Sequence, residues 1–152
     1  MKILMVCLGN ICRSPLAEGI LQKEAAKEGL DWQIDSAGTE PFHVGEPPHL
    51  LSQKVAAEHG LDLSTQRARR FTKEDFDHFD KLYAMAEDVY EEMMLIGKGN
   101  GEASKTDLLL NEVYPGENRS IPDPWYGGED GFHKAWALIS SACTQIIKKY
   151  GR

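Results

Sequence analysis

Short apolar runs alternate with amphipathic segments along almost the whole chain. Runs of strand length lie at 3–7, 32–37, 79–85 and 106–110, and segments with helical spacing of apolar residues lie at 14–28, 48–59, 88–96 and 131–150. Strands that alternate with helices build a mostly parallel sheet with helices on both faces. The order predicts an α/β fold with three layers, α/β/α, around a central four-stranded parallel sheet.

Nothing in the sequence divides the chain. Its 152 residues contain no repeat, no low-complexity tract and no linker rich in Gly, Ser or Pro, so we expect a single domain over 1–152. Loops are expected at 97–101 and 114–128. The second is long for a compact domain and carries three prolines and two neighbouring aromatic residues, which makes it a candidate functional loop.

Charge and cysteine usage exclude several classes of function. A net charge of −7 disfavours nucleic acid as a partner, and no apolar run approaches membrane-spanning length. The three cysteines are an odd number, and no export signal precedes them, so we expect reduced thiols and a cytoplasmic location. The basic cluster Arg67, Arg69, Arg70 and Lys73 is interpreted as a solvated loop leading into a helix, with a docking patch as the alternative.

The segment between the first apolar run and the first amphipathic segment reads CLGNICRSP, from Cys7 to Pro15. Gly9 and Asn10 are residue types that tolerate positive φ, which lets successive N–H groups turn inward and form a nest for a tetrahedral oxyanion. Ser14 followed by proline is typical of a helix start, and a helix start attracts anions. The segment therefore predicts a phosphate-binding loop after the first strand.

Two side chains in this loop carry chemistry. Inward amides, a helix N-terminus and a nearby guanidinium stabilise the Cys7 thiolate, which is the nucleophilic form of cysteine. Arg13 offers a planar fork of donors that matches two phosphate oxygens. The Ser14 hydroxyl either caps the helix or donates to the Cys7 sulfur, and the sequence does not separate the two. The loop is completed by Leu8, Gly9, Asn10, Ile11 and Cys12.

The chain resembles the low-molecular-weight protein tyrosine phosphatases. The resemblance rests on VCLGNICRSP at 6–15 and DPWYG at 123–127, with weaker similarity in DSAGT at 35–39, GEPP at 45–48 and TKEDF at 72–76. It implies hydrolysis of phosphotyrosine-type monoesters through a phosphocysteine, with no metal and no cofactor. By the same resemblance Asp123 is the general acid, held protonated by the apolar cover of Trp125 and Tyr126, and the pH optimum is mildly acidic.

The resemblance also assigns supporting residues. Phe42, Trp125 and Tyr126 match aromatic walls of the substrate pocket, and Asn10, Ser14 and Ser36 match residues that brace the loop. Cys12 matches a cysteine that forms a protective disulfide with the nucleophile, a buried inert thiol being the alternative.

Two positions depart from the family pattern. Gln66 stands where a histidine is common, and Ala86 stands where an acidic residue is common. If these two positions form a charged pair in the family, that pair is absent here, and a family pH profile does not carry over.

Two other functions remain open on the sequence. An arsenate reductase uses a similar loop but needs shuttle cysteines, and the stretch 79–97, where we expect them, has none. A phosphocysteine carrier or phosphoprotein-binding module needs no general acid.

The expected partners are a phosphotyrosine protein or small aryl phosphate, with inorganic phosphate as product. The five histidines show no metal-site spacing and are expected at the surface or in packing, and Cys143 is expected as a buried hydrophobe.

Overall fold

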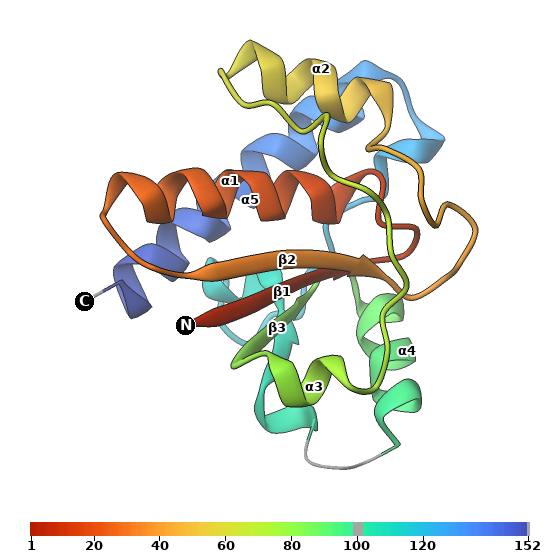
Figure 1. The fold of residues 1–152 in the computed structure, drawn as a ribbon, viewed down its shortest axis with the longest axis vertical. Helices are drawn as coiled ribbons and strands as arrows, with labels where there is room; N and C mark the ends of the chain where they lie inside the picture. Colours follow the sequence, from red (N-terminus) through yellow and green to blue (C-terminus); the bar gives the residue numbers. More distant parts are fainter. Residues whose placement is uncertain (99–101, 152) are drawn as a thin grey trace.

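The computed structural model describes residues 1–98 and 102–151 and is built around a four-stranded, fully parallel sheet with the order β2-β1-β3-β4 (Figure 1). The strands are β1 (Lys2–Cys7), β2 (Gln33–Gly38), β3 (Lys81–Ala84) and β4 (Thr106–Leu108). The predicted three-layer α/β/α fold is confirmed. The fourth strand is shorter than the apolar run that predicted it, because Leu109–Glu112 form a 3-10 helix, η2.

In the described residues, five α-helices cover the sheet. Helices α1, α2 and α5 lie on one face, and α3 and α4 lie on the other (Figure 1). Their bounds are Arg13–Lys27 for α1, Leu50–Glu58 for α2, Asp75–His78 for α3, Glu87–Gly97 for α4 and Glu129–Tyr150 for α5. The expected loop at 97–101 is described only in part: Gly97 ends α4, Lys98 follows in a left-handed conformation, and 99–101 lie outside the described residues. None of the helices in the described ranges is both long and apolar enough to cross a membrane.

Strand β1 is buried on both of its faces, which explains its uninterrupted apolar sequence. Ile3 and Met5 point toward α1 and α5, whereas Leu4 and Val6 pack with residues of β3 and α4, and all four side chains are fully buried. Central strands of parallel sheets read as continuous hydrophobic runs for this reason. The chain therefore has no freedom to shift β1, and the position of its last residue is fixed.

The carboxyl end of β1 lies where the strand order changes direction. From β1 the chain crosses through α1 to β2 on one side, and it later returns to β3 on the other side. Parallel sheets bind ligands at such a switch point. Cys7 is the last residue of β1, and its register partner Gly38 ends β2. A Cβ atom on Gly38 would lie 2.8 Å from the Leu8 carbonyl oxygen, so a glycine is needed for the following loop to pack there.

Candidate active site

The loop between β1 and α1 turns its carbonyl groups outward. The carbonyl oxygens of Cys7, Leu8 and Ile11 accept hydrogen bonds from the backbone N–H groups of Thr39, Glu40 and His49, at 3.0, 2.9 and 2.8 Å. Apart from bonds internal to helices and strands, the N–H groups of residues 8–12 make no backbone hydrogen bond among the described residues. Inward amides left without acceptors form the kind of concavity that binds oxyanions.

Only one of the two flexible loop residues adopts positive φ. Asn10 has a φ of 58°, as the sequence predicts, but Gly9 is absent from the positive-φ residues. Glycine at position 9 allows a close approach instead, because a Cβ atom there would lie 3.0 Å from Cδ2 of His43 and would press on that ring. The expectation of positive φ at Gly9 is therefore wrong, and close approach to a neighbouring ring replaces it.

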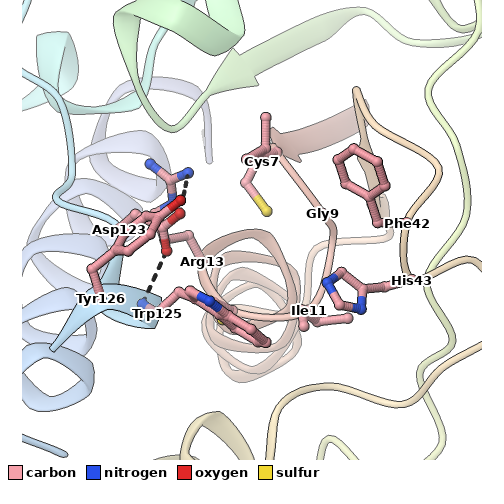
Figure 2. A pocket seen from close by; sticks show the side chains of 11 residues that line it. Cys7, Gly9, Ile11, Arg13, Phe42, His43, Asp123, Trp125 and Tyr126 are labelled. Atoms are coloured by element: carbon pink, nitrogen blue, oxygen red, sulfur yellow. Dashed lines mark hydrogen bonds and ion pairs between the residues drawn. The ribbon is translucent and has the colours of Figure 1, made fainter. Parts of the chain in front are cut away.

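The Cys7 sulfur points into the pocket above this loop (Figure 2). The residue is only 2% exposed, and its Sγ lies 2.9 Å from the Ser14 hydroxyl oxygen. Ser14 does not cap α1, since the helix begins at Arg13 and its N-cap residue is Cys12, which makes no side-chain cap. Of the two uses of Ser14 that the sequence leaves open, the structure has the contact with sulfur.

Arg13 is a buried cation with unused donors. Its Nη1 donates to the Ile121 carbonyl oxygen at 3.0 Å, and its Nη2 lies 3.6 Å from Oδ2 of Asp123. Its Nε is buried and has no hydrogen-bond partner among the described residues. A buried guanidinium is costly unless its donors are satisfied, and a planar oxyanion face matches its fork. The side chain is therefore poised to bind an anion.

Asp123 stands at the wall of the same pocket. It is the N-cap of the 3-10 turn η3 (Pro124–Tyr126), where its Oδ1 accepts from the Trp125 N–H at 3.0 Å. Its other oxygen faces Arg13, and Figure 2 shows both contacts as dashed lines. The turn thus fixes a carboxyl group between the guanidinium and the pocket mouth.

Aromatic side chains flank the pocket on two sides. Phe42 and His43 lie on one side and Tyr126 on the other, with Trp125 between them and next to His43 (Figure 2). Phe42, Trp125 and Tyr126 are 71%, 49% and 84% exposed, so their faces are open to a ligand at the mouth. The cavity measures about 240 Å³ and is lined by Cys7, Leu8, Gly9, Ile11, Cys12, Arg13, Phe42, His43, Asp123, Trp125 and Tyr126.

His43 was not expected in the pocket. Its Nδ1 lies 3.1 Å from the Glu46 carboxylate, and its ring centroid is 5.6 Å from that of Trp125. The residue follows Phe42 directly, which is the one signal in the sequence that points to it. His43 and Trp125 are far apart in the sequence, so their ring contact is visible only in the folded protein.

The other described histidines lie outside the pocket lining. His49 accepts from the Leu51 N–H and packs on Trp125, and His59 stacks on Trp136 with centroids 4.3 Å apart. His133 joins Glu58 and Glu129 in a group whose ligand atoms lie within 4.8 Å of one another. Lys54 Nζ already lies 2.7 Å from Glu129 Oε1, so a cation is present in that group without a metal.

A hydrogen-bond network lies beneath the loop. Asn10 Nδ2 donates to the hydroxyl oxygens of Ser14 and Ser36 at 2.8 and 2.9 Å. Asn10 Oδ1 accepts from the backbone N–H of Arg69 at 3.0 Å. Ser36 in turn donates to Oε1 of Glu18 at 2.6 Å. The three residues expected to brace the loop lie together, and Glu18 joins them unpredicted.

Arg69 belongs to this support rather than to a solvated loop. Its guanidinium pairs with Asp35 at 3.1 Å and with Asp75 at 3.1 Å, and Asp75 is buried. Its backbone also extends the end of β2, where Arg70 forms a bridge with Gly38. The ion pairs thus hold in place the N–H group that orients Asn10.

The two departures from the family pattern lie on opposite faces of the sheet. Gln66 donates from Nε2 to the Pro15 carbonyl oxygen at 3.1 Å, on the face covered by α1. Ala86 packs in the cluster on the face covered by α4. The two positions therefore do not lie together, and neither carries a charged side chain here.

Cys12 lies in the loop but is buried. Burial, with a smaller contribution from neighbouring Cys7, raises the pKa of the Cys12 thiol to about 12. Burial likewise raises the pKa of Cys143, on α5. Both residues are free thiols, as is Cys7. At neutral pH neither Cys12 nor Cys143 supplies a thiolate.

The Glu18 carboxyl is the titratable group that the fold perturbs beside the network. Burial raises its pKa from 4.5 to about 7, against the opposing hydrogen bond from Ser36. Between those values the folded protein keeps a proton that the unfolded chain has released, so the free energy of unfolding falls as the pH rises and levels off above about 7. The ionised carboxylate therefore destabilises the fold at neutral and alkaline pH.

We expect Glu18→Gln to remove this pH dependence. Relative to the wild type, the variant should gain about 2 kcal/mol in free energy of unfolding between about pH 5 and about pH 8. Urea denaturation of both proteins at the two pH values measures the difference. Glu28→Gln, at the exposed end of α1, is the matched control and should show no such gain. An equal pH response of wild type and Glu18→Gln would contradict the assignment.

Comparison with known proteins agrees with this site. The family model described as low molecular weight phosphotyrosine protein phosphatase matches residues 2–152. A low molecular weight protein-tyrosine-phosphatase of Bacillus subtilis, YfkJ, is 38% identical over 96% of this chain and 93% of its own length.

Two solved structures share the fold and provide ligand or substrate information. Vibrio vulnificus Wzb in complex with benzylphosphonate is 28% identical with a TM-score of 0.86, over 97% of each chain. A drosophila arginine phosphatase is 33% identical with a TM-score of 0.90, over 100% of this chain and 99% of the other. With its anion nest, its buried arginine and a family match over 2–152, this chain belongs to the low molecular weight phosphotyrosine protein phosphatase family.

Proposed function

We propose that this enzyme hydrolyses phosphotyrosine-type monoesters, with Cys7 as nucleophile, Arg13 as phosphate clamp and Asp123 as general acid. In the first step the Cys7 thiolate attacks phosphorus, and the bond from phosphorus to the phenolic oxygen breaks. The proton of Asp123 passes to that oxygen, so the leaving group departs as a neutral phenol. The product of this step is a phosphocysteine.

The second step returns the enzyme to its starting state. The Asp123 carboxylate takes a proton from water, the resulting hydroxide attacks phosphorus, and the phosphorus–sulfur bond breaks. Inorganic phosphate leaves, and Cys7 is again a thiolate. The Ser14 hydroxyl, 2.9 Å from the sulfur, donates to the departing thiolate. In both steps the loop amides and Arg13 neutralise the charge on the equatorial oxygens.

One observation supports this proposal most directly: the buried Cys7 sulfur, the Arg13 fork and the Asp123 carboxyl all face one small cavity (Figure 2). Cys7 is 2% exposed and the Asp123 side chain is 23% exposed, so the carboxyl is nearer the mouth, where we expect the leaving oxygen. The exposed aromatic faces at the mouth suit an aryl ring. The benzylphosphonate bound by the Vibrio relative has the same combination of ring and phosphorus.

The structure argues against the alternative functions. The described part of 79–97 contains no cysteine that could serve as a shuttle thiol, so arsenate reduction is not favoured. A carrier would not need Asp123 beside Arg13. The name of the drosophila relative suggests phosphoarginine as a substrate of that protein. Phosphoarginine would place a guanidinium in this pocket. Among the described residues, the only carboxylate that lines the pocket is Asp123, which already lies beside Arg13. An uncharged aryl ring avoids that competition.

Turnover without metal tests the proposal. We expect the protein to hydrolyse para-nitrophenyl phosphate and a phosphotyrosine peptide in excess EDTA. The same peptide with phosphoserine should react at least about 100-fold more slowly in kcat/KM, because its short side chain does not bring phosphorus down to the buried sulfur. Phosphate release assays on both peptides and on a phosphoarginine peptide measure the preference.

Three results would contradict the proposal: loss of activity in EDTA, equal rates on the three peptides, or faster arsenate reduction under thioredoxin coupling than ester hydrolysis. A cytoplasmic location remains a prediction from the reduced thiols.

A further inference from the structure

We propose that Glu18 is a positioning residue for Cys7: its carboxyl is the acceptor at one end of a hydrogen-bond chain that runs outward from Asn10 and, at its other end, aims the Ser14 hydroxyl at the sulfur. The inference rests on the proposed use of Cys7 as nucleophile. The chain runs from Glu18 through Ser36 and Asn10 to Ser14, and each of these residues is at least nine-tenths buried. No water-exposed group is needed to complete it.

The direction of the chain is fixed at Asn10. The backbone N–H of Arg69 can only donate, so the Asn10 atom that it meets at 3.0 Å is the amide oxygen. The amide nitrogen therefore faces the two serines, and its two hydrogens go to Ser14 Oγ and Ser36 Oγ. Each serine hydroxyl is thereby an acceptor from Asn10.

The remaining hydrogens follow by counting donors. A serine hydroxyl has one hydrogen, and neither serine needs it for Asn10. Ser36 directs its hydrogen to Glu18 Oε1 at 2.6 Å, a length typical of a charge-assisted bond. Ser14 directs its hydrogen to the Cys7 sulfur at 2.9 Å. The Cys7 thiolate thus accepts the Ser14 hydroxyl hydrogen, because Asn10, Ser36 and Glu18 already have their hydrogen-bond partners.

Glu18 is what keeps Ser36 in this arrangement. If position 18 offered no acceptor, the Ser36 hydroxyl hydrogen would turn toward Asn10, because an unmade buried hydrogen bond is costly. The Asn10 amide would then lose its hydrogen bond to Ser36 and move away from Ser14. Glu18 lies one helical turn after Ser14 in α1, on the same face, so the helix itself holds the two ends of the chain in register. The carboxyl accepts through Oε1 whether or not Oε2 carries a proton.

The charged groups that face Glu18 come from other elements. Asp35 on β2 opposes its ionisation, and Arg69, from the segment before α3, favours it. Gln22 donates to Oε2 at 3.3 Å from the next turn of α1. All three are unchanged in the variants below, so they contribute equally to each comparison.

Two variants of Glu18 separate acceptor from charge. Glu18→Gln and Glu18→Met are both neutral, have similar length and suit a helix, but only glutamine keeps an oxygen for Ser36. The readout is the pH dependence of Cys7 alkylation by iodoacetamide, followed by mass spectrometry of its peptide, with kcat and KM on para-nitrophenyl phosphate. Glu24→Met, elsewhere on α1, is the matched control.

In Glu18→Met we expect the alkylation midpoint to rise by about one pH unit and kcat to fall about tenfold, with KM within about twofold. Glu18→Gln and Glu24→Met should stay within about twofold of the wild type. If Glu18→Met does not fold, Ser36→Ala cuts the chain from the other side and should shift the midpoint in the same direction. Identical behaviour of Gln and Met at position 18, or an unshifted Ser36→Ala, overturns the proposal.

The alkylation assay needs no turnover, so the two proposals fail separately. A wild type that is alkylated at Cys7 but does not hydrolyse aryl phosphates refutes the proposed function and leaves the positioning chain standing. A wild type that hydrolyses them, with a Glu18→Met midpoint at the wild-type value, refutes the chain alone.

Discussion

Cys7→Ser is expected to lower the turnover of aryl phosphates by about 10⁴-fold or more, as removal of a catalytic nucleophile does in other covalent enzymes. A serine hydroxyl at the end of β1 is not ionised at neutral pH, whereas the sulfur is surrounded by inward amides, the start of α1 and a buried guanidinium. The nest itself does not depend on the sulfur, because its carbonyls are held by backbone donors from the loop after β2.

The variant should therefore still bind phosphate. Isothermal titration calorimetry with inorganic phosphate should give affinities for Cys7→Ser and the wild type that agree within about threefold. Cys143→Ala, a buried thiol on α5 outside the pocket, is the control and should keep wild-type turnover. Residual activity above about one-tenth of the wild type in Cys7→Ser would remove Cys7 from the role of nucleophile.

The sheet and its larger helices could be predicted because their signals are local. Strand β1 reads as an apolar run and α5 as a long amphipathic segment, and both lie within two residues of their expected bounds. The end of β4 was missed because Leu109 and Leu110 are as buried as strand residues although they lie in a 3-10 helix. Apolar character reports burial, and it does not report backbone conformation.

The start of α1 shows why a local rule failed. Serine before proline favours an N-cap, yet the helix begins two residues earlier, at Arg13, and the Ser14 hydroxyl contacts Cys7. A tertiary partner seven residues away competed successfully with the local cap. The same competition cannot be seen in a sequence window, because it requires β1 and α1 to be packed together.

The remaining site residues depend on contacts between distant segments. Asn10 meets the backbone of Arg69, 59 residues away, and Ser36 meets Glu18 from a different element. One clue to Glu18 exists in the sequence: it stands between Ala17 and Gly19 in a run, 14–21, that is otherwise apolar or small. A carboxylate in such a position is either exposed or specifically bound. Only the fold shows that it is bound.

The contacts of Asp123 suggest how its proposed role can be tested. Arg13 Nη2 lies 3.6 Å from its Oδ2, and the Trp125 N–H donates to its Oδ1 at 3.0 Å. A bound phosphate would occupy the Arg13 fork and lie beside the carboxyl. If Asp123 donates a proton to the leaving oxygen, its effect should depend on how much protonation the leaving group needs.

Asp123→Asn is expected to lower kcat for a phosphotyrosine peptide by about 10²–10⁴-fold, the usual contribution of general acid catalysis. Asparagine keeps the oxygen that accepts from Trp125, so η3 should remain folded and KM should change little. The loss should be at least about tenfold smaller for para-nitrophenyl phosphate, because nitrophenolate leaves without a proton far more readily than tyrosinate. Single-turnover kinetics isolate this first step from phosphocysteine hydrolysis. Asp130→Asn, exposed at the start of α5, is the control. Equal losses on the two substrates would show that Asp123 positions the phosphate without donating a proton.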